Sequence, residues 1–416
     1  MSALVSHPTG NANLRAVLRG LENAGLLGEF HTTIALPPRL VNGLERLSNR
    51  TARLQQRSFS EAGGARVVSH PVRETSRQLV KRLGFRWMDR HERGWASVDA
   101  VHRALDGKVA NRLKSAASRT PSAVYCYEDC AHATFAAAQT LGLARLYDLP
   151  IAYWRTSRGL LLEEAERWPD WAPTLEGLCD SGAKLERKDA ELELADRVLV
   201  ASTFTKRSLT DCFGDKFDIA VTPYGCPPLR VDRPACRQDN EPLRVLFVGH
   251  LNQRKGLADL IAALKRLDKD WRVTLAGPMP RHVPEALRHL LADPRCEWLG
   301  VLPHCTLLQR MQKEHVFVFP SIVEGFGMVI TEAMAAALPV ITTPHTAGPD
   351  LLTDGEDGFI VPIRDPDAIA SRLSCLAADE RLRQNMAFRA LSTAADNSWR
   401  RYERQVAEMV KTAQSE

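Results

Sequence analysis

The stretch Val316-Phe-Val-Phe-Pro-Ser-Ile-Val-Glu324-Gly-Phe-Gly-Met-Val-Ile-Thr-Glu332 contains the pattern that predicts the fold. It begins with an apolar, β-prone run, continues into a glycine loop, and leads into the strong helix formers of residues 332–337. Gly325 and Gly327 flank Phe326 and allow a ligand to approach the backbone closely. Amide groups at a helix N-terminus receive anions, so this βα unit is a candidate diphosphate site.

The same alternation of short apolar runs and amphipathic segments continues on both sides of this unit. We predict strands at residues 244–248, 272–276, 297–299, 316–319 and 340–342, and helices at residues 257–267, 284–291, 306–313 and 366–377. This order predicts a doubly wound, mostly parallel sheet with helices on both faces.

The first half of the chain shows a similar pattern, with strands predicted at residues 3–6, 66–69, 123–127, 150–154 and 197–201. A proline-rich polar segment then interrupts the alternation, as a linker would. Near the end, Tyr402, Val406 and Val410 stand at helical spacing. We therefore expect an N-terminal domain at residues 1–225, a linker at 226–242, a C-terminal domain at 243–392 and a C-terminal helix within 393–416.

Composition agrees with two globular α/β domains, because the chain has 416 residues, of which 44% are hydrophobic and 25% charged. No run approaches the ~18 uncharged apolar residues that span a bilayer, and the N-terminus lacks a signal-peptide pattern. Nine cysteines without a C-x-x-C pair favour reduced thiols. We expect a cytoplasmic protein.

Two carboxylates, Glu324 and Glu332, stand on either side of the glycine loop. A carboxylate accepts two hydroxyl hydrogen bonds at once, which suits a ribose diol or a sugar ring. The alternative is a helix-capping Glu324 and a solvent-facing Glu332, both ordinary near a helix N-terminus.

A second candidate anion site follows the strand at residues 244–248. There Gly249 permits a sharp exit, and Arg254 and Lys255 place two cations at the carboxyl edge of the sheet, where ligands of doubly wound folds bind. A solvated turn is the alternative, but both loops are expected at the same sheet edge.

These motifs resemble, in order and spacing, those of retaining nucleotide-sugar glycosyltransferases of family 4. The likeness rests on Phe247-Val-Gly-His-Leu-Asn-Gln-Arg-Lys-Gly256, Leu275-Ala-Gly277, Phe319 to Met328, Glu332-Ala-Met-Ala, Pro339-Val-Ile and Asp357-Gly-Phe-Ile-Val-Pro362. It implies a GT-B architecture, in which two Rossmann-like domains face each other across a cleft and the C-terminal helix crosses back to the first domain.

The resemblance also implies roles for single residues. Glu332 would bind the donor ribose, Glu324 the donor sugar, and the amides of Gly325, Phe326 and Gly327 the sugar and phosphates. Arg254 and Lys255 would hold the diphosphate beside Gly249 and His250, and the loop from Gly300 to Leu302 would meet the base of a donor that is most commonly UDP- or GDP-linked.

We expect no metal and no further cofactor, because fixed cations and helix-terminal amides stabilise a departing nucleoside diphosphate on their own. The Asp365-Pro366-Asp367 segment reads as a helix N-cap with proline in the first turn. Cys126, Cys130 and His132 lack a fourth metal ligand at recognisable spacing, and the cysteines read as packing residues.

Two positions depart from the family pattern. His250 stands where many members have arginine, so one diphosphate contact is neutral or pH-dependent. Many members also have a histidine at the end of an N-domain strand, a place that we assign to Trp154 and Arg155.

Further acceptor candidates are the loop residues Gly10, Asn11 and Asn13, and the strand-end group of Glu128, Asp129 and His132. A plain βα turn and ordinary helix capping are the respective alternatives.

We thus expect a glycosyltransferase that moves a sugar from a nucleotide sugar to a glycan, lipid or small metabolite, with no role for nucleic acid. A nucleotide-sugar 2-epimerase and a catalytically silent nucleotide-sugar-binding protein are the alternatives. The segment from Arg77 to Arg93 mixes basic residues with Leu83, Phe85 and Trp87, as a peripheral contact on the inner face of a membrane would, although the ordinary interpretation of such a pattern is a solvated helix face.

Overall fold

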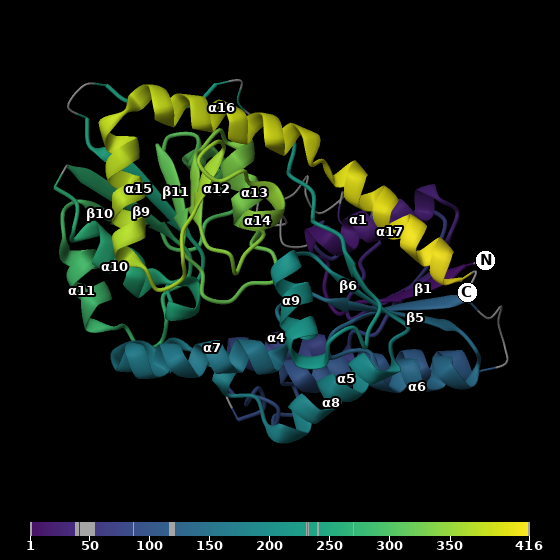
Figure 1. Cartoon of the computed structure of the whole chain (residues 1–416). Coiled ribbons are helices and arrows are strands. Elements are labelled where there is room, and N and C mark those ends of the chain that lie inside the picture. Colours follow the sequence, from purple (N-terminus) through teal and green to yellow (C-terminus); the bar gives the residue numbers. More distant parts are fainter. Residues whose placement is uncertain are drawn as a thin grey trace.

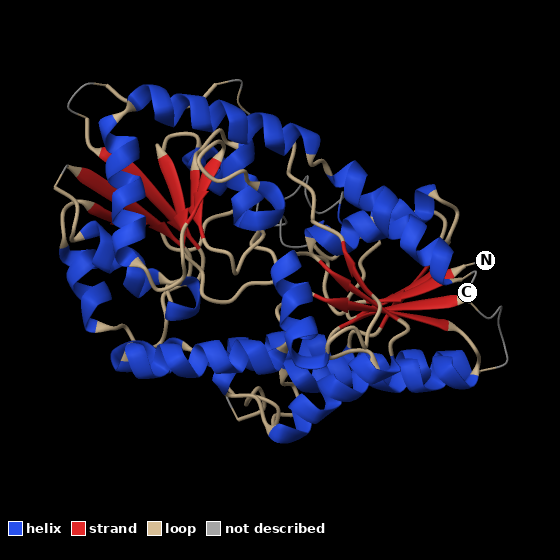
Figure 2. Ribbon diagram, in the orientation of Figure 1, coloured by secondary structure: helices blue, strands red, loops and turns tan. Residues whose placement is uncertain are grey.

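Two parallel β-sheets flanked by helices form the computed structural model, which describes residues 2–37, 41, 55–85, 87–115, 121–229, 231, 233–238, 241–268 and 270–414 (Figures 1 and 2). The N-terminal sheet has the order β3-β2-β1-β4-β5-β6-β7, and the C-terminal sheet has the order β10-β9-β8-β11-β12-β13. All pairings in both sheets are parallel. The prediction of two Rossmann-like domains is therefore confirmed.

The strands of the N-terminal sheet are β1 (Ala3–Ser6), β2 (Leu27–Thr32), β3 (Arg66–Ser69), β4 (Ala123–Tyr127), β5 (Ala144–Leu149), β6 (Arg197–Val200) and β7 (Ile219–Val221). Those of the C-terminal sheet are β8 (Leu243–Val248), β9 (Trp271–Ala276), β10 (Cys296–Trp298), β11 (Val316–Phe319), β12 (Val340–Thr342) and β13 (Gly358–Ile360).

The helices of the first domain are α1 (Ala12–Asn23), α4 (Val72–Leu83), α5 (Val98–Lys114), α6 (His132–Thr140), α7 (Trp154–Arg167), α8 (Gly182–Leu194) and α9 (Thr203–Phe213), with 3₁₀ turns η2 (Ser60–Ala62), η3 (Pro169–Thr174) and η4 (Glu176–Leu178). The second domain contains η5 (Gln253–Lys255), α10 (Leu257–Leu264), α11 (Glu285–Ala292), α12 (His304–Met311), α13 (Met328–Ala335), α14 (Gly348–Leu351), α15 (Pro366–Ala378) and α16 (Glu380–Asp396), and α17 (Trp399–Ala413) follows.

Strand β8 shows why the central strands read as continuous apolar runs. Its alternate residues enter two different cores: Leu246 and Val248 pack into one hydrophobic cluster, and Val245 and Phe247 pack into another. Both faces of the strand are covered by helices, so neither face needs polar residues.

One predicted strand was wrong. Residues 150–154 are not a strand, because β5 ends at Leu149 and Trp154 begins α7. Arg145 and Asp148 interrupt the apolar pattern of the true strand, yet Asp148 is buried, and this burial raises its pKa to about 7.

The last helix lies on the first domain. Figure 1 shows α17 continuing from α16 and running along α1. Arg19 Nε donates to Glu403 Oε1 at 2.7 Å, and the backbone of Glu403 lies so close to Gly20 that a Cβ there would come within 2.4 Å of its carbonyl oxygen. The chain end is thus packed against the N-terminal domain.

None of the helices in the described ranges combines the length and the apolar character that crossing a membrane requires.

Candidate functional site

The turn after β8 carries the two cations that the sequence singled out. Gly256 closes the turn in the left-handed conformation, at φ +71°, and a Cβ at this position would lie 1.9 Å from the carbonyl oxygen of Pro320. Only glycine allows so close an approach at this φ. The turn therefore packs directly against the end of β11, from which the glycine loop departs.

This packing joins Arg254, Lys255 and Glu324 into one charged cluster. Glu324 Oε1 accepts a hydrogen bond from Arg254 Nη1 at 2.7 Å and another from Lys255 Nζ. Arg254 Nη1 also donates to the carbonyl oxygen of Val323 at 2.9 Å. The structure thus brings together the three residues predicted to carry the chemistry.

Burial and the charges of the three residues together set the protonation states in this cluster. Desolvation lowers the pKa of Lys255 to about 8, although the neighbouring Glu324 acts to raise it. Burial disfavours the ionised form of Glu324, but the charges of Lys255 and Arg254 outweigh this effect and lower its pKa. At neutral pH the cluster therefore contains an ionised carboxylate and two cations.

The glycine loop connects this cluster to α13. Gly327 adopts φ +86° and precedes the first residue of the helix, and Glu332 lies in the second turn. Glu332 Oε1 is 2.8 Å from Nε2 of His304, which belongs to α12. The two glutamates therefore have separate partners, and Glu332 also lines a shallow pocket with the linker residues Pro227 and Pro228.

Sequence reasoning missed His304. Its signal was its position, two residues after Leu302, directly after the loop from Gly300 that was expected to meet a base. Gly300 adopts φ +65° and turns the chain from β10 toward α12.

His250 lies at the rim of the same sheet edge and is exposed. Desolvation and, next, the charge of Arg254 lower its pKa, which favours the neutral ring. Gly249, with φ +149°, packs near the Lys255 side chain. The predicted neutral contact beside the cluster stays a prediction.

The glycine loop also contacts the first domain. The carbonyl oxygen of Gly325 accepts hydrogen bonds from Ser202 Oγ at 2.5 Å and from Thr205 Oγ1 at 3.1 Å. A Cβ on Gly325 would lie 1.7 Å from the carbonyl oxygen of Pro150, directly after β5. In this structure the domains are closed onto each other at the glycine loop.

A shared apolar cluster seals this contact. Ala152, Leu161 and Phe204 of the first domain pack with Ile322 and Val323 of the second. Water is thereby excluded from one side of the glycine loop.

The N-terminal loop residues have mainly structural partners. Asn11 caps α1 by accepting from the amide of Leu14 at 3.1 Å, and Gly10 packs against the backbone of Gln56. Asn13 is buried and donates to the hydroxyl of Tyr224 at 3.2 Å. The Tyr224 ring in turn packs against Phe326, with centroids 5.0 Å apart, so the two loops are joined through one tyrosine.

Trp154 and Arg155 bind Asp189 of α8. Trp154 Nε1 donates to Asp189 Oδ1 at 2.6 Å, and Arg155 Nη2 donates to Asp189 Oδ2 at 2.9 Å. Pro150, rather than either of these residues, is the position at the strand end that meets Gly325.

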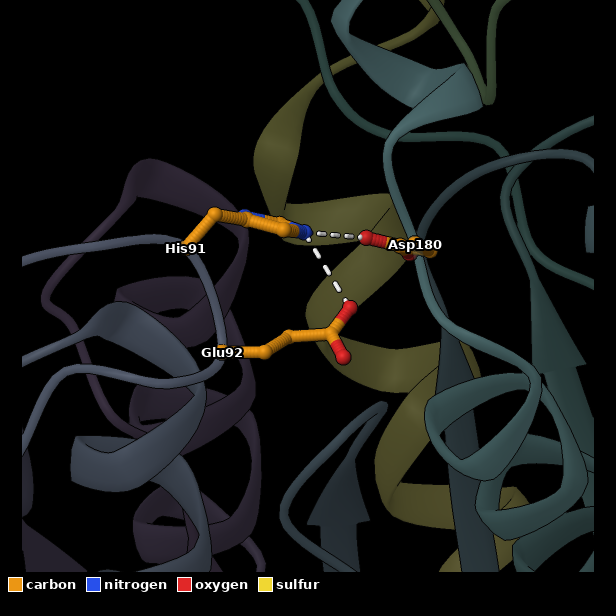
Figure 3. Close-up of side chains that lie close together, drawn as sticks. All are labelled: His91, Glu92 and Asp180. Carbon is orange, nitrogen blue, oxygen red and sulfur yellow. Dashed lines mark hydrogen bonds and ion pairs between the residues drawn. The ribbon is translucent and has the colours of Figure 1, made fainter.

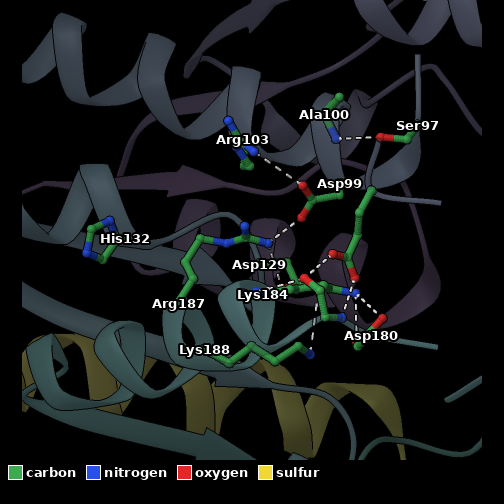
Figure 4. A network of polar contacts seen from close by, with 12 residues as sticks. Ser97, Asp99, Ala100, Arg103, Asp129, His132, Asp180, Lys184, Arg187 and Lys188 are labelled. Atoms are coloured by element: carbon green, nitrogen blue, oxygen red, sulfur yellow. Dashed lines mark hydrogen bonds and ion pairs between the residues drawn. The ribbon is translucent and has the colours of Figure 1, made fainter. Parts of the chain in front are cut away.

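The strand-end residues after β4 belong to a network of charges (Figure 4). Glu128 pairs with Lys188 at 2.8 Å, and Asp129 lies 3.6 to 3.7 Å from Lys184, Arg187 and Lys188. His132 is exposed, and among the residues drawn no contact joins it to this network. Cys126 and Cys130 lie in a hydrophobic core and not in a ligand cluster.

The structure brings together three metal-ligating side chains that the sequence analysis did not single out. They are His91, Glu92 and Asp180 (Figure 3). His91 Nε2 lies 2.9 Å from Asp180 and 3.2 Å from Glu92. Lys184 Nζ, at 2.9 Å, already neutralises Asp180, so the geometry alone assigns no metal here.

The basic and aromatic segment forms an outward apolar surface. Val72, Leu79 and Leu83 stand at helical spacing on the solvent side of α4, and Val72 and Trp87 are each 70% exposed. Lys81, Arg82, Arg90 and Arg93 are also exposed, whereas Arg86 lies outside the described residues.

The domain that holds this geometry matches a known family. Residues 230–392 match the family described as Glycosyl transferases group 1. We refer to the domain that contains these matched residues as the group 1 domain. It contains the whole charged cluster, the glycine loop and Glu332.

Curated relatives match parts of the chain. The chain is 28% identical over 269 residues to a glycogen synthase of Mycobacterium tuberculosis, covering 62% of this chain and 61% of that protein. It is 41% identical over 157 residues to the capsular polysaccharide biosynthesis glycosyltransferase CapM of Staphylococcus aureus, covering 35% and 40%. A D-inositol 3-phosphate glycosyltransferase of Corynebacterium diphtheriae is 33% identical over 164 residues, covering 37% and 38%. The chain thus spans less than two thirds of the length of these relatives.

Solved structures extend the likeness to the whole chain. A sucrose-phosphate synthase from Thermosynechococcus elongatus superposes with a TM-score of 0.65 at 16% identity, covering 99% of both chains. Anabaena Alr3699/HepE in complex with UDP and glucose gives a TM-score of 0.64 at 15% identity, covering 99% of this chain and 100% of that one. At these identities the likeness concerns the fold, and it confirms the predicted GT-B architecture.

Replacing Gly325 with alanine should open the closed interface. Its Cβ would overlap backbone atoms of Pro150, so the domains must separate, and we expect the free energy of unfolding to fall by about 1–3 kcal/mol. Urea unfolding and the radius of gyration from small-angle scattering measure both effects. Gly159→Ala in α7 is the control, because no atom lies within 4 Å of its Cβ. Equal stability and an equal radius in both variants would contradict the packing described.

Proposed function

We propose that the chain is a metal-independent, retaining glycosyltransferase that moves a sugar from a nucleotide sugar to an acceptor on the N-terminal domain. The observation that carries this proposal is the cluster of a half-buried Arg254 with the buried Lys255 and Glu324, within the group 1 domain. It lies beside a glycine loop at the N-terminus of α13, where the two domains meet.

The difficult step is the departure of a nucleoside diphosphate that gains negative charge. Arg254 and Lys255 are two cations already fixed by Glu324, and the amides of the glycine loop add helix-terminal donors. When the diphosphate binds, it would share these cations with Glu324, whose carboxylate then faces the donor sugar. Glu332 would accept the ribose hydroxyls in place of His304.

Transfer needs an acceptor and exclusion of water. The contact of Gly325 with Ser202, Thr205 and Pro150 supports a closed state that shields the donor from hydrolysis. The acceptor would enter at the strand ends of the N-terminal domain. Its class is a glycan, a lipid or a small metabolite, and the relatives' names include a capsular polysaccharide glycosyltransferase and a D-inositol 3-phosphate glycosyltransferase.

A panel of UDP-, GDP- and ADP-sugars tests the proposal directly. We expect calorimetry to detect one donor, and Lys255→Met to weaken its binding at least about tenfold, because a charge-assisted contact is lost. The bound donor should also be slowly hydrolysed with release of a sugar of retained configuration. A 2-epimerase would instead return an isomerised sugar or nucleotide sugar, and a binding protein would leave the donor intact. Failure to bind any donor of the panel would refute the proposal.

The lowered pKa of Lys255 predicts a pH dependence for donor binding. Below pH 8 the side chain keeps its proton, and as pH rises through about 8 it loses the charge that holds the diphosphate. We expect the dissociation constant of UDP or GDP to rise about tenfold between pH 7 and pH 9. Lys255→Arg stays charged in this range and should flatten the profile. A wild-type profile as flat as that of the arginine variant would contradict the assignment.

The outward surface of α4 leads us to propose peripheral binding to an anionic membrane. Exposed Leu79, Leu83 and Trp87 would insert at the interface, and each nearby basic residue would add about 1 kcal/mol. We expect co-sedimentation with vesicles of phosphatidylcholine and phosphatidylglycerol, lost on the double change Lys81→Glu and Arg82→Glu. The matched pair Arg281→Glu and Arg288→Glu, exposed in the other domain, should bind as the wild type does. Equal loss in both pairs, or no vesicle binding by the wild type, would refute this proposal.

A further inference from the structure

An arm of the N-terminal domain reaches into the group 1 domain. Figures 1 and 2 show α7 extending away from the first domain to lie below the second sheet, and η3 follows α7 in the chain. Trp171 of η3 is 2% exposed and belongs to the hydrophobic core around β8 and β9. The arm, residues 154–174, is therefore an integral part of the second domain's packing.

Charged contacts hold the arm in place. Arg167 Nη1 lies 2.6 Å from Asp259 Oδ1 in α10, and Asp170 Oδ2 accepts from the amide of Glu285 at 2.6 Å. The carbonyl oxygen of Arg364 accepts from Arg167 Nη2 at 3.0 Å. These contacts fix the position of the arm. They do not involve residues 249–256, the turn that carries Arg254 and Lys255, which we call the cation turn.

Glu164 of the arm does touch the cation turn. It is fully buried, and its Oε2 accepts a hydrogen bond from Gln253 Nε2 at 2.6 Å, while its Oε1 pairs with Arg364. Thr174 adds a second contact, because its Oγ1 accepts from the backbone amide of Gln253 at 3.3 Å. Two residues of the first domain thus bind the residue that immediately precedes Arg254 and Lys255.

Gln253 transmits this contact to the turn. It is itself fully buried, its Oε1 accepts from the amide of Ala258 at 2.8 Å, and its Nε2 also donates to Asp259 at 2.8 Å. The side chain therefore ties the start of η5 to the start of α10. The position of both cations depends on where Gln253 is held.

We propose that Glu164 is a positioning residue that acts through Gln253. It holds the cation turn where Arg254 and Lys255 can bind the diphosphate, so that the N-terminal domain completes the donor site. The inference rests on the proposed function, because it presumes that this turn binds a nucleoside diphosphate. A buried carboxylate is costly unless its partners satisfy it, and here Gln253 Nε2 and the Arg364 guanidinium do so. Loss of the bond leaves the catalytic groups intact and displaces them, and displacements of about 1 Å cost large factors in function.

Calorimetry with Glu164→Leu tests this role, because leucine removes the acceptor for Gln253 Nε2 whereas glutamine would keep one. The probes are UDP and GDP and the nucleosides uridine and guanosine. We expect the diphosphate that binds the wild type to bind at least about tenfold more weakly to the variant. Affinity for the matching nucleoside should not change, because the base and ribose contacts lie elsewhere. The control is Glu163→Leu, since Glu163 is the preceding residue of α7 and pairs with Arg364 but not with Gln253.

The other possible results overturn the inference in different ways. Unchanged diphosphate binding by Glu164→Leu overturns it and leaves the proposed function standing. An equal loss for diphosphate and nucleoside, or an equal loss in Glu163→Leu, reduces Glu164 to a structural tie between domains and also overturns it. If Glu164→Leu does not fold, Thr174→Val, which removes the acceptor for the Gln253 amide, decides by the same comparison. If the wild type binds neither UDP nor GDP, the result refutes both the inference and the expectation of a UDP- or GDP-linked donor.

Discussion

The structure depends on one carboxylate, Glu324, that lies between the charges of Arg254 and Lys255. Burying charged groups costs several kcal/mol for each ion unless close partners compensate. Here the compensating partners lie on two loops that follow different strands, so these loops must pack closely against each other. Gly256 makes this possible, because any larger residue would collide with the backbone at Pro320. The sheet edge is therefore built around a charged group that a substrate phosphate can share.

The second domain is not complete by itself. The glycine loop is hydrogen-bonded by Ser202 and Thr205, and the arm that carries Glu164 and Trp171 enters its core. Closure therefore concerns both the donor loop and the cation turn. A site assembled from two domains forms only when the domains are correctly placed relative to each other. This suits a reaction that must exclude water until the acceptor is present.

Much of this architecture was predictable from the sequence, because parallel strands covered on both faces read as apolar runs and the helices between them have a clear period. The position of the charged cluster followed from the rule that such sheets bind ligands at their carboxyl edge. Residues 150–154 were misassigned because the polar Arg145 and Asp148 hide the true strand β5. The arm was not predictable, since Trp171 and Glu164 are buried by another domain and local periodicity carries no information about that. The partner of Glu332, His304, became evident only in three dimensions, because the two residues lie 28 positions apart in the sequence, on different helices.

The decisive measurement is a crystal structure with bound nucleoside diphosphate, at a pH where Lys255 is protonated. We predict a β-phosphate within hydrogen-bonding distance of Lys255 Nζ and the Arg254 guanidinium, the ribose hydroxyls on Glu332, and the α7 arm still bound to Gln253. A nucleotide bound elsewhere, with the pairs of Glu324 to both cations unchanged, would contradict a donor site at this sheet edge.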